Sequence, residues 1–250
     1  MDVLVGTSGY AYKEWRGSFY PEKTKEKDML RYYAGRLRTV EINNTFYRLP
    51  ARETLLRWAD EVPPGFVFVL KASQRITHRQ RLKPESKETV DYLFEVASAL
   101  GERLGPVLFQ TPPLFKKDVA RLRDFLGLLP AGRPVAFEFR HETWRDEEVY
   151  EALRGRNAAL VCADTDESGE AGAPVVPTAD WGYLRLRRCD YDDAGLAAWR
   201  ERIRAQPWQR AFVFFKHEDD KPLGWPAIER FASPGGAGGV GYPPGWKAVP

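Results

Sequence analysis

Residues 135–141, VAFEFRH, form a short apolar run in which aromatic and charged side chains alternate before the run ends on polar residues. Seven further runs resemble it, and they recur at intervals of roughly 25 to 40 residues. They are VLVGTS from Val3, TVEIN from Thr39, FVFVLK from Phe66, PVLFQ from Pro106, ALVCAD from Ala159, GYLRLR from Gly182 and AFVFFKH from Ala211. Each run has the length and composition of a buried strand.

Most gaps between these runs are long enough for one amphipathic helix. The clearest predicted helices are Met29–Leu37, Ala51–Val62, Lys87–Leu104, a helix capped by Asp118 that ends near Pro130, Glu147–Leu153 and Ala194–Ile203. Residues 165–180, rich in Gly, Ala and Pro, are expected to form a loop with at most a short helix. Alternating strands and helices predict an α/β fold, a (β/α)8 TIM barrel, as a single domain over residues 1–232. The Gly- and Pro-rich tail, residues 233–250, is expected to be loosely packed or disordered.

Composition narrows the class of protein. The 250 residues fit one barrel, and a formal net charge of +3 argues against a surface that is basic throughout. No apolar stretch approaches the roughly 20 residues needed to span a bilayer, and the N-terminus lacks the features of a signal peptide. Two cysteines are too few for a disulfide framework, so we expect a cytoplasmic protein. The sequence contains no organic cofactor motif and does not indicate an oligomeric state.

Strand periodicity predicts which side chains face the barrel axis. Charged residues cannot lie beneath the helices without a large desolvation cost, so the apolar alternation orients each strand. This argument predicts three pairs of residues that face the axis, one pair from each of three strands. The pairs are Glu41 and Asn43, Glu138 and Arg140, and Arg185 and Arg187. The ends of the other strands add Lys71, Gln110, Asp164 and Lys216. In barrels of this type the C-terminal ends of the strands form the active site.

Cations outnumber carboxylates in this predicted set, which favours a small anionic substrate carrying phosphate or carboxylate. Glu41, Glu138, Asp164 and His141 are the candidate catalytic residues, since proton transfer needs titratable groups near the substrate. A closed network of salt bridges that only stiffens the barrel mouth is the alternative. The candidate substrate-binding residues are Thr7, Ser8, Tyr10, Trp15, Asn43, Tyr47, Lys71, Gln110, Arg140, Trp144, Arg185 and Lys216.

Two further patterns occur in the loops after the strands. The only histidines, His78, His141 and His217, all follow strands and could join the carboxylates around one divalent ion. Because no HExxH or HxH spacing links them, we assign no metal ligands and leave one divalent ion as an open alternative. Aromatic residues are concentrated in the same loops, where they either stack on a substrate or pack on one another.

Several long motifs resemble one known family. These are GTSGYAYKEWRGSFYP, VEINNTFYRLP, FVFVLKASQRITH, GPVLFQTPP, VAFEFRHETW, LVCADT and FVFFKHED. Together they resemble the bacterial and archaeal YecE-like proteins, domain of unknown function 72, over the chain to about Arg230. The resemblance implies a TIM barrel without a settled activity, and a distant likeness to the barrel of endonuclease IV. That enzyme binds three zinc ions through several histidines, and this chain has too few histidines for such a cluster.

Three functions are therefore open. The first is an enzyme that uses acid/base chemistry on an anionic substrate. One form of this hypothesis is metal-assisted chemistry on a phosphodiester or a sugar phosphate, which would make the protein a hydrolase or another sugar-phosphate enzyme. The second is a nucleic-acid-binding or repair-associated protein that grips a phosphate backbone without cutting it. Its candidate contacts are Arg16, Arg48, Arg75, Arg79, Arg81 and Lys83. The third is a barrel that binds a small metabolite or a partner protein and catalyses nothing.

Overall fold

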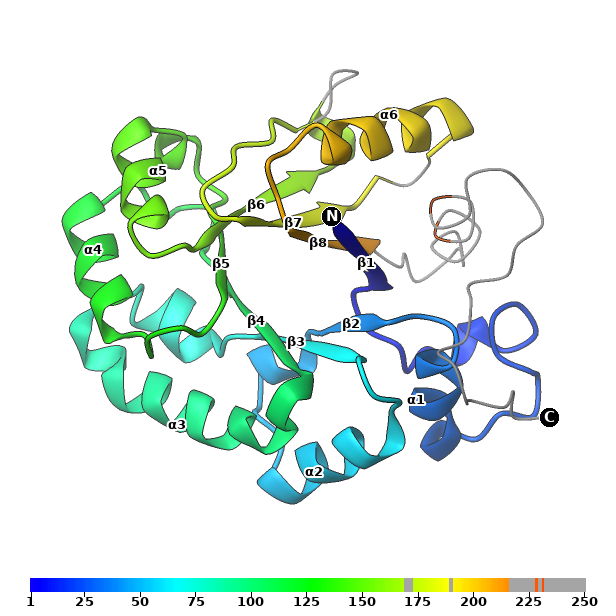
Figure 1. The fold of residues 1–250 in the computed structure, drawn as a ribbon. Coiled ribbons are helices and arrows are strands. Elements are labelled where there is room, and N and C mark those ends of the chain that lie inside the picture. Colours follow the sequence, from blue (N-terminus) through cyan, green and yellow to red (C-terminus); the bar gives the residue numbers. More distant parts are fainter. Residues whose placement is uncertain (169–172, 189–190, 216–227, 229–230, 232–250) are drawn as a thin grey trace.

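Eight parallel strands form a nearly closed barrel in the computed structural model of the protein (Figure 1). The structure describes residues 1–168, 173–188, 191–215, 228 and 231. The strands are β1 (Asp2–Thr7), β2 (Thr39–Ile42), β3 (Val67–Lys71), β4 (Leu104–Gln110), β5 (Val135–Glu138), β6 (Ala159–Asp164), β7 (Trp181–Leu186) and β8 (Arg210–Phe215). Consecutive strands pair from β2 through β8, and β8 pairs with β1. This order confirms the predicted (β/α)8 barrel.

The helices lie outside the strands (Figure 1). They are α1 (Glu26–Ala34), α2 (Arg52–Glu61), α3 (Lys87–Ala97), α4 (Val119–Leu128), α5 (Glu147–Arg154) and α6 (Asp193–Arg204). Short 3-10 turns occur at Lys13–Trp15, Asn44–Phe46, Pro84–Ser86, Ser98–Arg103, Glu142–Trp144 and Asp166–Ser168, and a π-helical turn at Arg75–Arg79. No helix in the described part of the chain is long and apolar enough to cross a membrane.

Most predicted helices occur within a few residues of their expected bounds, but the third was predicted too long. α3 ends at Ala97 rather than Leu104, because a 3-10 segment follows and Gly101 adopts a positive φ of 56°. β4 accordingly begins at Leu104, before the expected Pro106. Asp118 caps α4 as predicted, since its carboxylate accepts a hydrogen bond from the backbone N–H of Arg121 at 3.0 Å.

The barrel interior below the strand ends is apolar. Leu4, Val69, Leu108, Ala136, Tyr183, Phe212 and Phe214 belong to one buried cluster inside the strands. Phe137 and Phe139 instead pack with residues of α4 and α5, as the alternation of β5 predicts. The charged residues of the same strands therefore share a face with the interior cluster and lie above it, toward the C-terminal ends.

A tyrosine fills the seam where β1 meets β2. These two strands are joined by a single bridge between Ser8 and Glu41. Lower in the seam, the buried hydroxyl of Tyr33 in α1 accepts from the Thr7 N–H at 2.9 Å and donates to the Thr39 carbonyl at 3.0 Å. Tyr33 thus supplies the hydrogen bonds that a direct ladder would otherwise provide, and it holds the end of β1 beside β2.

The link between β6 and β7 contains only the short turn Asp166–Ser168 among its described residues, in agreement with the predicted loop.

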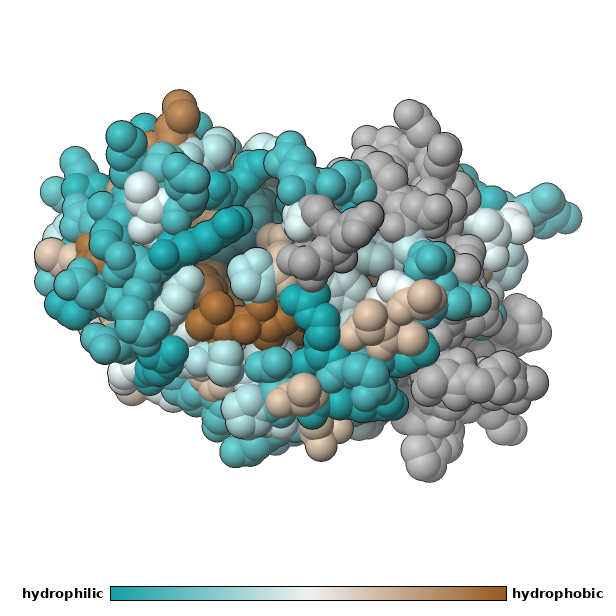
Figure 2. Space-filling view, turned by 90° about the horizontal axis from the view of Figure 1, so that it is seen from above, coloured by the Kyte–Doolittle hydropathy of each residue, from teal (hydrophilic) through white to brown (hydrophobic). Residues whose placement is uncertain are grey.

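Figure 2 views the molecule from the side where α5 and α6 lie, and it shows a hollow whose floor is formed by hydrophobic residues and whose rim is formed by hydrophilic ones. The expected tail, residues 233–250, lies outside the described residues.

Candidate functional site

Two buried glutamates share one buried arginine at the C-terminal end of the barrel. Glu41 ends β2, Glu138 ends β5, and Arg185 lies near the end of β7. The Arg185 guanidinium donates through Nη2 to Glu41 Oε1 at 2.9 Å and through Nη1 to Glu138 Oε2 at 2.6 Å. All three side chains are at least 95% buried. We call these three residues the axial cluster.

Neutral donors complete the hydrogen bonding of both carboxylates. The hydroxyl groups of Ser8 and Tyr183 donate to Glu41 at 2.8 and 2.6 Å. The Asn43 amide also donates to Glu41, at 3.2 Å. The Gln110 amide donates to Glu138 Oε1 at 2.8 Å. Ser8, Asn43, Gln110 and Arg185, all predicted from sequence, are therefore brought together around the two glutamates.

Both glutamates are held in their ionised form. Burial alone would raise the pKa of each carboxyl. The charge of Arg185 opposes this effect at both carboxyls. The Tyr183 and Ser8 hydroxyls add to it at Glu41, and Arg187 and Gln110 add to it at Glu138. The pKa of each glutamate is therefore lowered. A carboxylate that is ionised and fully hydrogen-bonded is a poor proton donor. Through their ion pairs the two carboxylates hold Arg185 at the axis.

Further cationic side chains surround the axial cluster. Lys71 at the end of β3, Arg140 after β5 and Arg187 after β7 form no ion pair with any described residue. Arg187 is half-buried, and burial followed by the charge of Arg185 lowers its pKa. Its Nε is buried and has no hydrogen-bond partner among the described residues. Arg185 Nε is likewise buried without a partner among the described residues, so the mouth holds two guanidinium N–H groups without a described acceptor.

Lys71 and His78 are two neighbouring groups whose pKa values are both lowered, and only that of Lys71 moves toward neutral pH. The Lys71 ammonium donates to Gln110 Oε1 at 2.9 Å and lies 4.5 Å from the centre of the Phe46 ring. Burial and then Arg185 lower the pKa of Lys71 to about 8. His78 packs edge-on against the same ring, and burial followed by Lys71 and Arg140 lowers its pKa.

Asp164 does not join the axial cluster, in contrast to its predicted position. Its carboxylate accepts from Arg188 Nε at 2.7 Å, Arg188 Nη2 at 3.0 Å and the Tyr191 hydroxyl at 2.8 Å. We call Asp164, Arg188 and Tyr191 the lateral cluster. In β6 the outward face carries Leu160 and Cys162, and Asp164 follows with the same alternation, so it faces away from the axis.

Several predicted binding residues have structural partners elsewhere. Thr7 faces away from the axis, where its hydroxyl contacts Tyr33 and the Gly9 carbonyl. Trp15 is 2% exposed and packs against neighbouring rings, with half-buried Tyr10 beside the same cluster. Trp144 is 1% exposed, donates to the Phe115 carbonyl and stacks on Phe139. These loop rings mostly pack on one another, which was the alternative to stacking on a substrate. Tyr47, in contrast, is 73% exposed.

The two described histidines, His78 and His141, have different partners. His141 caps the turn Glu142–Trp144 through a hydrogen bond from the Thr143 N–H, whereas His78 lies against Phe46. His217 and Lys216 lie outside the described residues. Within the described ranges, no three His, Cys, Asp or Glu side chains are placed to hold a metal ion.

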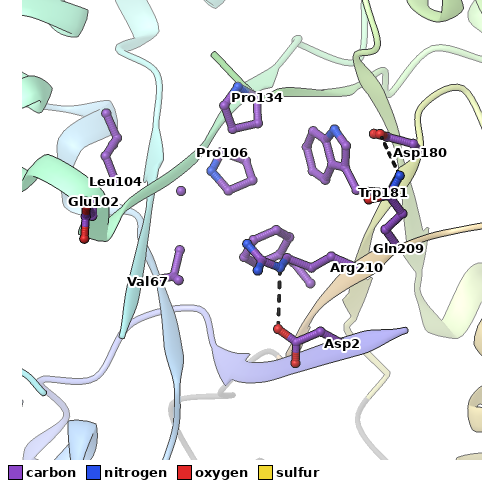
Figure 3. Close-up of a pocket in the computed structure, with 12 residues that line it drawn as sticks. Asp2, Val67, Glu102, Leu104, Pro106, Pro134, Asp180, Trp181, Gln209 and Arg210 are labelled. Carbon is purple, nitrogen blue, oxygen red and sulfur yellow. Dashed lines mark hydrogen bonds and ion pairs between the residues drawn. The ribbon is translucent and has the colours of Figure 1, made fainter. Parts of the chain in front are cut away.

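A cavity of about 460 Å³ opens at the opposite, N-terminal end of the barrel (Figure 3). Its walls include Val67, Pro106 and Trp181, and Asp2 pairs there with Arg210 at 3.5 Å. In barrels of this type, catalytic residues lie at the C-terminal ends of the strands, whereas the N-terminal end serves stability. The axial cluster and its cations are therefore the stronger candidate.

The sequence named Arg185, but it did not reveal the roles of Tyr183, Arg187 and His78. Tyr183, Arg185 and Arg187 alternate along β7 and point to the same side of the sheet. Tyr183 resembles an ordinary interior ring in the sequence, yet its hydroxyl binds Glu41. Arg187 and His78 were placed near the mouth, but only the structure shows that Arg187 lacks a partner and that His78 lies beside Lys71.

The fold and site define a (β/α)8 barrel with a buried charged cluster at its C-terminal mouth. The chain belongs to the DUF72 family, described as protein of unknown function DUF72, whose model matches residues 4–233. This confirms the resemblance found in the motifs.

Individual relatives agree with that assignment. The UPF0759 protein YunF of Bacillus subtilis is 26% identical over 235 residues, which cover 89% of this chain and 81% of YunF. The UPF0759 protein YecE of Escherichia coli is 32% identical over 129 residues, 50% of this chain and 47% of YecE. The crystal structure of a DUF72 family protein from Thermotoga maritima is similar with a TM-score of 0.78 and 28% identity, covering 92% of this chain and 98% of that one.

Proposed function

We propose that the protein is an enzyme that binds a small anionic substrate at the C-terminal mouth of the barrel and acts on it by acid/base chemistry. The observation that carries this proposal is the set of Lys71, Arg140 and Arg187 without ion-pair partners among the described residues. Lys71 and Arg187 are half-buried, and such cations destabilise a fold unless a counter-charge compensates them, whereas Arg140 is exposed and adds positive charge at the mouth. A phosphate or carboxylate group supplies that charge and accepts the free N–H of Arg187.

The acid/base role falls to Lys71 and His78 rather than to the glutamates first considered. A general acid or base works best when its pKa lies near the working pH. The pKa of Lys71 is lowered to about 8, whereas Arg185 keeps Glu41 and Glu138 ionised. The glutamates then act as counter-charges that hold Arg185 beneath the substrate.

The binding part of this proposal is tested by thermal unfolding of the whole chain in inorganic phosphate, with sodium chloride at matched ionic strength as the reference. A ligand that binds only the folded state raises the melting temperature in a saturable way. We expect saturable stabilisation by phosphate, and an affinity about tenfold weaker in Arg187→Met. The matched control is Arg123→Met on the exposed face of α4. Equal behaviour of the two variants, or no saturable effect, would refute the anion site.

A second candidate function is contact with single-stranded nucleic acid. The exposed Tyr47 ring is followed by exposed Arg48, and Arg75 and Arg79 are exposed on the next loop. Aromatic stacking beside guanidinium groups suits a nucleotide chain. If this function holds, oligonucleotide affinity falls steeply with added salt and Tyr47→Ala weakens it. Oligonucleotide binding that changes neither with added salt nor in Tyr47→Ala would refute this second function.

A further inference from the structure

Lys71 is held by a neutral partner rather than by a carboxylate. Its Nζ donates to Gln110 Oε1 at 2.9 Å, and it has no ion-pair partner among the described residues. The Gln110 amide is oriented because its Nε2 donates to Glu138 Oε1 at 2.8 Å, so its oxygen must face Lys71. A carboxylate in that place would lock the lysine as an ammonium ion. An amide oxygen carries no net charge and favours the ammonium ion much less than a carboxylate does.

The surroundings of Lys71 favour the neutral amine more than those of an ordinary lysine. The guanidinium groups of Arg185 and Arg187 lie close enough to repel its charge, and the side chain is half-buried. The charges of Glu41 and Glu138 and the face of the Phe46 ring favour the cation, but burial and repulsion together outweigh them. Because the pKa is about 8, about one lysine in ten is neutral at pH 7.

We propose that Lys71 is a nucleophile that forms a Schiff base with the carbonyl group of an anionic aldehyde or ketone. This inference rests on the proposed function, because the anion site would bring the carbonyl to Lys71. The neutral amine adds to the carbonyl carbon, and the carbonyl oxygen takes up a proton to give a carbinolamine. The nitrogen releases a proton as the carbinolamine forms, and one further proton is taken up when the hydroxyl group leaves as water, which gives a protonated imine. Amine, carbonyl and one proton are thus converted to protonated imine and water without any oxidant or reductant.

Other residues at the mouth have matching roles. The His78 ring lies 4.9 Å from the Phe46 ring, centre to centre, and Lys71 lies over that same Phe46 ring. His78 Nδ1 shares a hydrogen bond of 2.9 Å with Thr77 Oγ1. Its Nε2 has no partner among the described residues and can exchange protons with the carbinolamine. Arg140 and Arg187 remain available for the phosphate or carboxylate of the same molecule.

The test is reductive trapping on the full chain, followed by peptide mapping. The protein is incubated with sodium cyanoborohydride and matched carbonyl probes: dihydroxyacetone phosphate against dihydroxyacetone, and pyruvate against acetone. We expect a stable secondary amine on Lys71, formed about tenfold faster than on exposed lysines, and faster with each anionic probe than with its neutral counterpart. The rate should rise from pH 6 to 8, as the neutral amine accumulates.

Variants separate the inference from the proposed function. Lys71→Arg keeps the charge and should lose the adduct, whereas Lys83→Arg, on an exposed loop, should keep it. Arg187→Met keeps Lys71 and should lose the preference for anionic probes. Phosphate stabilisation without enrichment of the adduct at Lys71 overturns the Schiff base and leaves the anion site intact. Rapid trapping at Lys71 with no preference for charge, and no phosphate stabilisation, supports the nucleophile and overturns the anion site.

Discussion

Two clusters that pair buried carboxylates with arginine lie at the ends of the strands, and they differ in how completely charge is balanced. In the lateral cluster, one carboxylate meets one arginine, and Asp164 also accepts from Tyr191 and the Ala173 N–H. In the axial cluster, one arginine serves two carboxylates, and further cations without ion-pair partners among the described residues lie around it. The same residue types therefore form a cluster with balanced charge in the lateral position and a cluster surrounded by cations without a described ion-pair partner in the axial position. The axial cluster is the one expected to bind a ligand.

The largest effect is expected from removing the shared arginine. Arg185→Met leaves Glu41 and Glu138 buried without their counter-charge, which should cost about 3–5 kcal/mol of unfolding free energy. Urea unfolding at pH 7 measures this change. A loss below about 1 kcal/mol would mean that water or Lys71 replaces Arg185, and the axial cluster would not be a buried ionic unit.

The lateral cluster should give a smaller loss and no change in ligand binding. Asp164→Asn keeps the side-chain shape but weakens the bond to Arg188, which is 22% exposed and can turn to water. We expect a loss of about 2 kcal/mol in urea unfolding, with phosphate stabilisation as in the wild type. If phosphate binding fell with Asp164→Asn but not with Arg187→Met, the roles of the two clusters would be reversed.

The difference between the clusters also marks how far the sequence could predict the site. Alternation along β2, β5 and β7 correctly directed Glu41, Glu138 and Arg185 to the axis, because bulky apolar neighbours on the other face leave no choice. In β6 the inward residues include Ala159 and Ala163, whose small size gives no such orientation, so Asp164 was misplaced.

Contacts between residues far apart in the sequence were beyond prediction. The bond between Arg185 and Glu41 joins strands from opposite parts of the chain, and it depends on side-chain reach across the barrel. The burial of Trp15 and Trp144 likewise depends on how loops fold over one another. The apolar runs themselves were enough for the barrel, since each strand and helix is encoded locally.

Lys71 should make the stability of the axial region depend on pH between about 8 and 10. In the folded state Lys71 loses its proton near pH 8, whereas an unfolded lysine keeps it to about pH 10.4. Between these values the unfolded state binds more protons, so this group makes the fold more stable as pH rises. Relative to Lys71→Met, wild-type stability should increase on the order of 1 kcal/mol from pH 8 to 10. Urea unfolding at several pH values measures it, and a constant difference would place Lys71 in ordinary solvent.

The smallest effect is expected at Asn43, and it tests how redundant the axial cluster is. Asn43 donates to Glu41 Oε1 at 3.2 Å, but Ser8 and Arg185 donate to the same oxygen at 2.8 and 2.9 Å. Because Oε1 keeps two donors, Asn43→Ala should cost only about 0.5 kcal/mol of unfolding free energy. Its effect on ligand binding then has a clear meaning, because the scaffold is unchanged. Weaker phosphate stabilisation in this variant would show that the Asn43 amide contacts the anion directly, whereas unchanged binding would confine Asn43 to orienting Glu41.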